Sequence, residues 1–184
     1  MRHNVECAPN GRHLAIEPLP QHAELLRESM PANVIVEEMA ITDDDVETEL
    51  EFLHVLGQSG YSGLRERDYP ETPRFQRLRV DAVSLDVLVD RHDLEPRLIR
   101  IDVEGAERLV LEGARRTIEQ YRPTLMVEHG SAAAGYGETS STFWDLSHEL
   151  GMRIYDFDGN GPYDRPGFMK AVGPFGYFNF LLRP

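Results

Sequence analysis

The fold of this 184-residue chain is decided by the stretch Leu98-Ile99-Arg100-Ile101-Asp102-Val103-Glu104-Gly105-Ala106-Glu107. Its first half is mostly apolar, which predicts a strand buried on both faces, as in parallel sheets. Gly105 permits a tight turn into the helix that follows. Open α/β sheets bind ligands outside the carboxyl ends of their strands, where Asp102 and Glu104 would lie. The stretch therefore predicts an α/β fold with two carboxylates at a binding edge, unless either one only caps the helix.

A neighbouring strand is predicted at residues 124–130, after a helix over residues 106–121. Crossovers of this kind are right-handed and place sequential strands side by side. Glu128 and His129 would then lie at the same edge as the carboxylates of the first strand. A lone histidine is often structural, but a position beside three carboxylates makes a catalytic role equally consistent with the sequence.

The N-terminal part predicts a further pair of strands. Residues 12–18 are interpreted as a short strand that ends at Glu17, and a helix at 20–30 and a strand at 34–41 follow. In nucleotide-binding α/β folds an acidic residue at this place accepts hydrogen bonds from ribose hydroxyls. The alternative is an exposed glutamate before a turn.

The middle of the chain predicts two antiparallel strands, because residues 49–55 and 75–80 alternate in polarity. The glycine-rich segment 57–64 between them is either a mobile lid over a small site or a simple linker. The acidic run 43–45 lacks the ligand spacing of a calcium loop and is predicted to be a solvated turn. Ser84 is a natural N-cap for the helix after the second strand.

The last part of the chain completes the predicted fold. Its elements are a helix at 141–151, a strand at 152–157, a loop at 162–176 and a closing strand at 177–182. No internal repeat or domain boundary is visible, so residues 1–184 are predicted to form a single domain. We expect the two loops, at 57–64 and 162–176, to set the substrate.

Composition narrows the classes of function. A formal net charge of −13 argues against nucleic acids and anionic membranes as partners, because both attract basic surfaces. No apolar run is long enough to span a bilayer, and the N-terminus lacks the apolar core of a signal peptide. Cys7 is the one cysteine, which excludes an intramolecular disulfide and a cysteine-cluster zinc site. We expect its thiol to be at least half-buried and the protein to be cytoplasmic.

Residues 102–107, Asp-Val-Glu-Gly-Ala-Glu, are followed by an apolar pair and by Glu-Gly-Ala at 112–114. This pattern resembles the signature of the FkbM family of S-adenosylmethionine-dependent methyltransferases. The flanking segments agree with the family in order and spacing from about Arg12 to the C-terminus. The resemblance implies a Rossmann-like class I methyltransferase fold, with a mostly parallel sheet and an antiparallel C-terminal strand.

The resemblance also implies a cofactor site. Glu17, in the pattern Ala-x-Glu-Pro, would grip the ribose of S-adenosylmethionine. Ala40 and Ile41 would lie beside the adenine ring, although ordinary core packing explains both almost as well. Asp102 is a further candidate for contact with the cofactor. The segment 57–64 resembles the serine-containing loop that family members carry here.

The chemistry that the resemblance implies is methyl transfer to a hydroxyl of a small molecule, such as a sugar or a polyketide-type natural product. The reaction needs a methyl-sulfonium, a hydroxyl held in line and a base, and proximity supplies most of the catalysis. Asp102, Glu104 and His129 are the candidate catalytic residues. Carboxylates would suit a magnesium ion, but alone they do not establish one. The oligomeric state does not follow from the sequence.

One departure from the family bears on activity. Complete members begin with a strand that carries an Asp-x-Gly-Ala-x-x-Gly loop, and no such loop precedes Glu17. We therefore expect the first, central strand to be missing, through a late start site, deliberate shortening or a natural fragment, and we expect weak or no cofactor binding. The alternative function is an inactive, truncated fragment that serves as a binding module along its unpaired strand edges. A dehydrogenase is less consistent, because no Gly-x-Gly-x-x-Gly is present.

Overall fold

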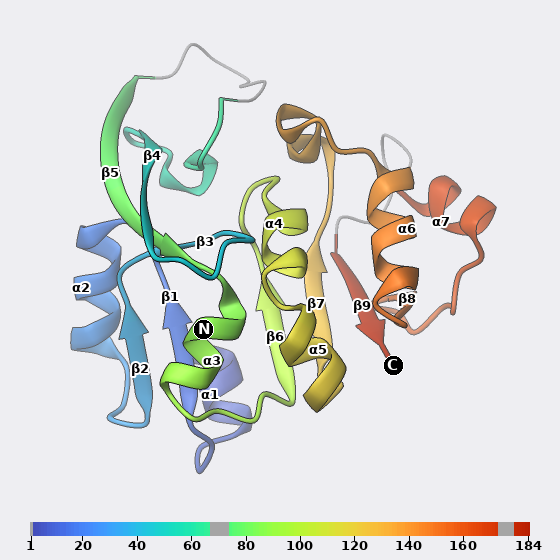
Figure 1. Ribbon diagram of the computed structural model, residues 1–184, viewed down its shortest axis with the longest axis horizontal. Coiled ribbons are helices and arrows are strands. Elements are labelled where there is room, and N and C mark those ends of the chain that lie inside the picture. The colour runs from blue at the N-terminus through green and yellow to red at the C-terminus, as the bar shows by residue number, and fades with distance from the viewer. Residues whose placement is uncertain (1, 67–73, 173–178) are drawn as a thin grey trace.

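The computed structural model describes residues 2–66, 74–172 and 179–184 of the chain. Within these ranges the chain forms three groups of paired strands with helices packed around them (Figure 1). The largest group is a sheet whose strands are hydrogen-bonded in the order β6, β7, β9 and β8. These strands are β6 (Leu98–Ile101), β7 (Thr124–Glu128), β8 (Arg153–Asp156) and β9 (Asn179–Arg183).

The directions of these strands agree with the sequence. β6 and β7 are parallel neighbours, whereas β9 runs antiparallel to both β7 and β8. The predicted parallel core with an antiparallel C-terminal strand is therefore confirmed. The carboxyl ends of β6 and β7 lie at one edge of this sheet, because Ile101 is paired with Val127 at the end of the ladder.

A pair of parallel strands lies at the opposite end of the molecule from β8 (Figure 1). β1 (His13–Ile16) and β2 (Val34–Glu37) are joined by α2 (Pro20–Ser29), and α1 (Arg2–Cys7) precedes them. The strand predicted at 12–18 and the helix predicted at 20–30 are confirmed. Glu17 follows directly after β1, at its carboxyl end.

The strand predicted at residues 34–41 is wrong in its extent. β2 ends at Glu37, and the short β3 (Ala40–Ile41) pairs instead with β5 (Phe75–Val83). β5 also pairs antiparallel with β4 (Thr48–Val55), as predicted. Ala40 packs in a small apolar cluster and Ile41 packs in the main core. The apolar stretch 34–41 therefore contributes strands to two different sheets.

The helix predicted over residues 106–121 is divided into α4 (Glu107–Glu112) and α5 (Arg115–Tyr121). Gly113 lies between them, and a Cβ atom there would lie 2.2 Å from the carbonyl oxygen of Thr42. The buried Asp86 then caps α5, because its carboxylate accepts the N–H groups of Arg116 and Thr117 at 2.9 and 2.7 Å. The C=O of Gly113 also accepts the N–H of Asp86 at 2.8 Å, so residues of α3 bind the chain at the break between the two helices.

The helices around the edge of the main sheet complete the fold. α3 (Leu85–Arg91) begins after Ser84, whose Oγ accepts the N–H of Val87, so the predicted N-cap is confirmed. After β7 come the 3₁₀ turn η2 (Ser131–Tyr136) and α6 (Ser140–Glu149). The predicted loop at 162–176 contains α7 (Arg165–Ala171), which Asp164 caps. Pro166 lies in the first turn of α7, where proline is compatible with a helix. Residues 173–178 lie outside the described ranges.

Burial corrects two further expectations. β6 is covered on one face only, because Ile101 is buried whereas Leu98 is 46% exposed and Arg100 is exposed. The thiol of Cys7, expected to be at least half-buried, is exposed. In the described part of the chain, no helix has the length and apolar character needed to cross a membrane.

Candidate functional site

The turn that follows β6 is built on two residues with left-handed backbone conformations. Glu104 has a φ of 54° and Gly105 has a φ of 104°. Asp102 lies just before them, and its Oδ2 accepts a hydrogen bond from Nη2 of Arg100 at 2.7 Å. The turn reverses the chain between strand and helix, as Gly105 predicted. Neither Asp102 nor Glu104 caps the helix, whose N-cap residue is Ala106.

Glu107 is the buried carboxyl that the sequence interpretation missed. It is the first residue of α4 and only 3% exposed, and its Oε1 accepts the N–H of Gly105 at 2.8 Å. Burial raises its pKa to about 7, and the carboxylates of Glu104 and Glu128 add to the effect. Helical spacing from the buried Val110 was a signal that could have identified it.

The end of β7 brings a histidine to the same edge. Glu128 is exposed, whereas His129 is only 2% exposed. Because β6 and β7 are parallel and in register, these residues follow β7 where Asp102 and Glu104 follow β6. The predicted meeting of the two strand ends is confirmed.

His129 is held by contacts on two sides. Its ring stacks on Phe143 with 4.3 Å between the ring centroids, and its Nε2 lies 3.3 Å from Oγ of Ser140. Nδ1 is buried and has no hydrogen-bond partner among the described residues. Burial lowers the pKa of His129 to about 4, against the opposing effect of Glu138. The imidazole is therefore neutral at neutral pH.

A small cavity lies between the turn and His129. Its volume is about 10 Å³, which is room for about one water molecule. Its polar lining comes from Glu107, Arg108, His129 and Glu138, and Phe143 contributes apolar surface. Glu17, Asp102 and Glu104 do not line it. The buried acid and the buried imidazole therefore share one space, whereas the three carboxylates predicted from the sequence lie outside it.

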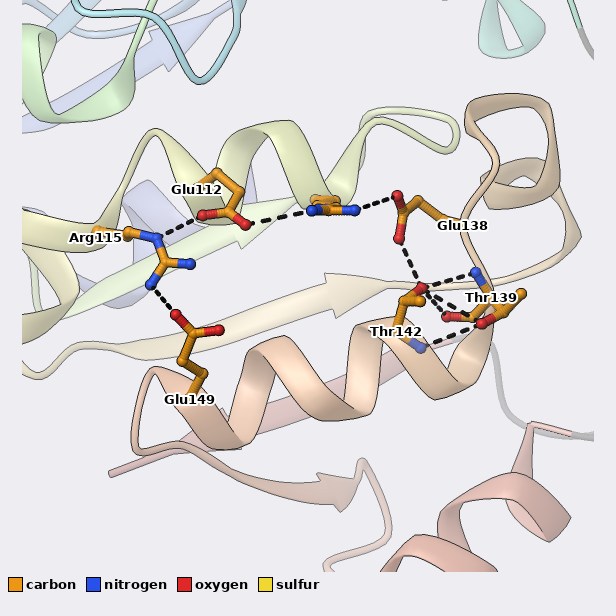
Figure 2. A network of polar contacts seen from close by, with 7 residues as sticks. Glu112, Arg115, Glu138, Thr139, Thr142 and Glu149 are labelled. Atoms are coloured by element: carbon orange, nitrogen blue, oxygen red, sulfur yellow. Dashed lines mark hydrogen bonds and ion pairs between the residues drawn. The ribbon is translucent and has the colours of Figure 1, made fainter.

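Ion pairs fix the wall of this cavity (Figure 2). Arg108 on α4 contacts Glu138 at 2.8 Å and Glu112 at 3.6 Å. Oε2 of Glu138 accepts the hydroxyl of Thr142 at 2.6 Å. Arg115 extends the network from Glu112 on α4 to Glu149 on α6. Exposed pairs stabilise little individually, but together these contacts tie α4 and α5 to α6.

The glycine-rich segment 57–64 lies against the same turn. A Cβ at Gly63 would lie 3.4 Å from the Tyr136 hydroxyl and 3.9 Å from the carbonyl oxygen of Glu104. Gly63 and Leu53 exchange two backbone hydrogen bonds, and the N–H of Leu64 donates to the Tyr136 hydroxyl at 3.1 Å. These hydrogen bonds hold the last residues of the segment. That the segment 57–64 moves as a lid stays a prediction.

The residues predicted to bind the cofactor lie apart from the cavity. Glu17 is half-buried, and its Oε1 accepts the N–H of Leu19 at 2.9 Å. Ala40 and Ile41 are buried in the two apolar clusters, as core packing alone would place them. Contact of these three residues with a nucleotide stays a prediction.

The donor set does not fit a magnesium ion. Asp102 is paired with Arg100, and Glu107 is turned toward the N–H of Gly105. Across residues 2–66, 74–172 and 179–184, no three histidine, cysteine or acidic side chains are grouped so that they could hold a metal ion. No step of the chemistry is therefore assigned to a metal.

Comparison with known proteins gives a family. The family model described as the methyltransferase FkbM domain matches residues 1–154. Among solved structures, the methyltransferase FkbM from Methylobacillus flagellatus KT is similar in fold, with a TM-score of 0.52 and 16% sequence identity. The similarity covers all of this chain but 40% of that one. No curated protein sequence matches. The chain has a Rossmann-like methyltransferase fold, and it belongs to the FkbM methyltransferase family.

Proposed function

We propose that this chain is the methyl-transfer part of an S-adenosylmethionine-dependent O-methyltransferase that acts on a hydroxyl of a small molecule, such as a sugar or a polyketide-type natural product. One observation carries the proposal. In a chain of the FkbM family, the carboxyl edge of β6 and β7 brings together carboxylates and the buried, neutral imidazole of His129. Open α/β sheets bind their ligands at such an edge.

Electrostatics at this edge favour the cofactor. S-adenosylmethionine supplies a methyl group on a positively charged sulfonium. Asp102, Glu104 and Glu128 surround the edge with negative charge, and the whole chain carries a net charge of −13. Opposite charges at short distance stabilise such a ligand. Asp102 is proposed to contact the cofactor from this edge, in addition to its candidate catalytic role.

The other end of the cofactor is assigned to the β1 edge. Glu17 is proposed to accept hydrogen bonds from the ribose hydroxyls. Ala40 and Ile41 are proposed to make apolar contact with the adenine ring. The half-buried carboxylate of Glu17 at the end of β1 supports the first assignment. The second rests on the family resemblance, because Ala40 and Ile41 are buried in the core.

The proton of the acceptor hydroxyl needs a base. As the methyl carbon leaves sulfur and bonds to the acceptor oxygen, the hydroxyl proton passes to the protein. Asp102, Glu104 and the neutral His129 are the candidates, and Nδ1 of His129 carries the lone pair when Nε2 donates to Oγ of Ser140. General base catalysis of this kind contributes about 10²- to 10⁴-fold to the rate.

A product assay tests this function. The chain is incubated with S-adenosylmethionine and a panel of hydroxylated sugars and polyketides, and S-adenosylhomocysteine and methyl ethers are measured by mass spectrometry. We expect His129→Asn to lower the rate at least about 100-fold if the imidazole is the base. Glu51→Gln, a change on the exposed part of β4, is the matched control and should keep the rate. Equal rates for both variants would remove His129 from the mechanism.

The second candidate function is a binding module without activity. Among the described residues, β1 is paired only with β2, and β6 is paired only with β7. A strand of another chain could extend either edge through main-chain hydrogen bonds. This alternative predicts no methylated product with any member of the panel, which distinguishes it from the enzyme.

A further inference from the structure

The turn after β6 has a conformation that needs support. Glu104 has a φ of 54°, and a side chain in the left-handed region costs about 1 kcal/mol. Gly105 follows with a φ of 104°. Glycine adopts such a conformation without steric cost, whereas a glutamate in it persists only where the surroundings determine it. The contacts of this turn therefore decide how the edge of the sheet is presented.

The support comes from Glu107. The N–H of Gly105 precedes α4 and has no place in the hydrogen bonds of the helix, as is usual at helix N-termini. Oε1 of Glu107 accepts this N–H at 2.8 Å. A buried carboxyl is an expensive acceptor, because desolvation penalises its charged form. Its use here indicates that the position of the turn matters.

We propose that Glu107 is a positioning residue, which holds the left-handed turn at Glu104 and Gly105 and so fixes how Asp102 and Glu104 are presented at the edge of the sheet. The inference rests on the proposed function only in calling this edge of the sheet a methyl-transfer site. The hydrogen bond and its test do not depend on that function.

The groups that face Glu107 set its response to pH. Glu104 in the turn and Glu128 after β7 oppose its ionisation. Arg108, His129 and Glu138 share the cavity with it, and Arg108 is paired with Glu138. Tyr136 on η2 also interacts with it.

Ionisation changes the bond that holds the turn. A carboxylate accepts the Gly105 N–H more strongly than a protonated carboxyl does, because the bond is then charge-assisted. Burial gives Glu107 a pKa of about 7, so this change falls near neutral pH. The turn is therefore held more tightly above pH 7 than below it.

Proton–nitrogen NMR of the whole chain tests the proposal. The amide resonance of Gly105 is followed from pH 5 to pH 9, and we expect it to titrate with a midpoint near 7. Glu107→Gln keeps an acceptor oxygen but cannot ionise, so its Gly105 resonance should not move in this range. Glu119→Gln removes an exposed carboxyl from α5 as the matched control, and the titration should remain. An unchanged titration in Glu107→Gln would overturn the proposal.

Hydrogen exchange of the same amide gives a second readout. Glu107→Ala removes the acceptor, and we expect Gly105 to exchange at least about 10-fold faster, as an amide does when its bond is lost. If this variant does not fold, the titration of Glu107→Gln still decides. Exchange at the unchanged rate in a folded Glu107→Ala protein would count against the proposal.

Activity separates this inference from the proposed function. In the product assay, Glu107→Gln should remove a limb of the pH–rate profile near pH 7 while the rate above pH 7 falls less than about 10-fold, a typical effect of a supporting residue. If no methyl transfer occurs but Gly105 titrates as expected, the proposed function is wrong and the positioning role of Glu107 stands. A retained limb in Glu107→Gln would contradict the positioning role.

Discussion

Two edges of this molecule have an acidic residue with a histidine nearby, but only at one edge are both side chains buried; we call that one the dry edge and the other the wet edge. At the β1 edge, Glu17 is half-buried and lies 3.8 Å from Nδ1 of the partly exposed His22. At the β6–β7 edge, Glu107 and His129 are 3% and 2% exposed and line one cavity. The residue types are alike, so the difference lies in access to water. Burial makes the second edge the chemically distinctive one.

Burial favours the neutral form of both groups at the dry edge. The pKa of Glu107 rises to about 7, and the pKa of His129 falls to about 4. Both side chains are therefore mostly neutral near pH 5.5. Their contributions to folding depend on pH in opposite directions. Between about pH 4.5 and pH 6.5 the two slopes largely cancel in the unaltered chain.

The largest expected effect comes from removing the ionisation of Glu107. Its folded pKa is raised, so its contribution to stability is full below pH 4.5 and is lost as pH rises to about 7. From pH 4.5 to pH 8, Glu107→Gln should therefore gain on the order of 3 kcal/mol relative to the unaltered chain. Urea unfolding at both pH values measures this. Glu17→Gln at the wet edge is the control, and an equal gain there would show that burial is not the cause.

The histidine should show the opposite sign. The folded pKa of His129 is lowered, so its contribution is full above pH 6.5 and is lost as pH falls to about 4. This loss is on the order of 3 kcal/mol at most, and His129→Gln should remove it. Parallel curves for the His129 variant and the unaltered chain would contradict the buried, neutral imidazole.

The turn at the dry edge should tolerate substitution less well than an open loop. Gly105→Ala places a side chain at a φ of 104°, and we expect it to lower the free energy of unfolding by about 2 kcal/mol. Gly60 has no neighbouring atoms that would meet a Cβ, so Gly60→Ala should change it by less than about 0.5 kcal/mol. Chemical denaturation measures both. Similar values for the two variants would mean that the turn is not strained.

The smallest effect on folding is expected at the wet edge. Glu17→Gln alters a half-buried side chain that bonds to the N–H of Leu19, and it should cost less than about 1 kcal/mol. If Glu17 grips the ribose, the same change should weaken binding of S-adenosylhomocysteine about 10-fold, as loss of a polar contact of about 1.4 kcal/mol does. Calorimetry measures the affinity. An unchanged affinity would remove Glu17 from the cofactor site.

Much of the dry edge could be predicted from local signals. The apolar runs of β6 and β7 and the glycine after them predicted two parallel strands with polar ends, and Asp102 and His129 were identified there. Glu107 was not identified as a site residue, although it is the last residue of the stretch 98–107 that decides the fold. Its burial depends on what packs over α4, which a single chain segment does not reveal.

Other differences between prediction and structure have the same origin. Gly113 lies between the two helices that were predicted as one, and its C=O accepts the N–H of Asp86, which is far away in the sequence. Propensity alone cannot show such a contact. The helix α7 was overlooked because Pro166 and Gly167 dominate its first turn, although Asp164 supplied a usable capping signal. Magnesium was left open by the carboxylates, and the described side chains do not gather to hold it.

The most direct test of the account is a chemical-shift map of S-adenosylhomocysteine on the labelled chain, which detects weak as well as tight binding. We predict that the perturbed amides include Glu17 at the end of β1 and residues 102–105 at the end of β6. Perturbations confined to the β8–β9 end of the sheet would contradict the assignment of the β6–β7 edge as the methyl-transfer site.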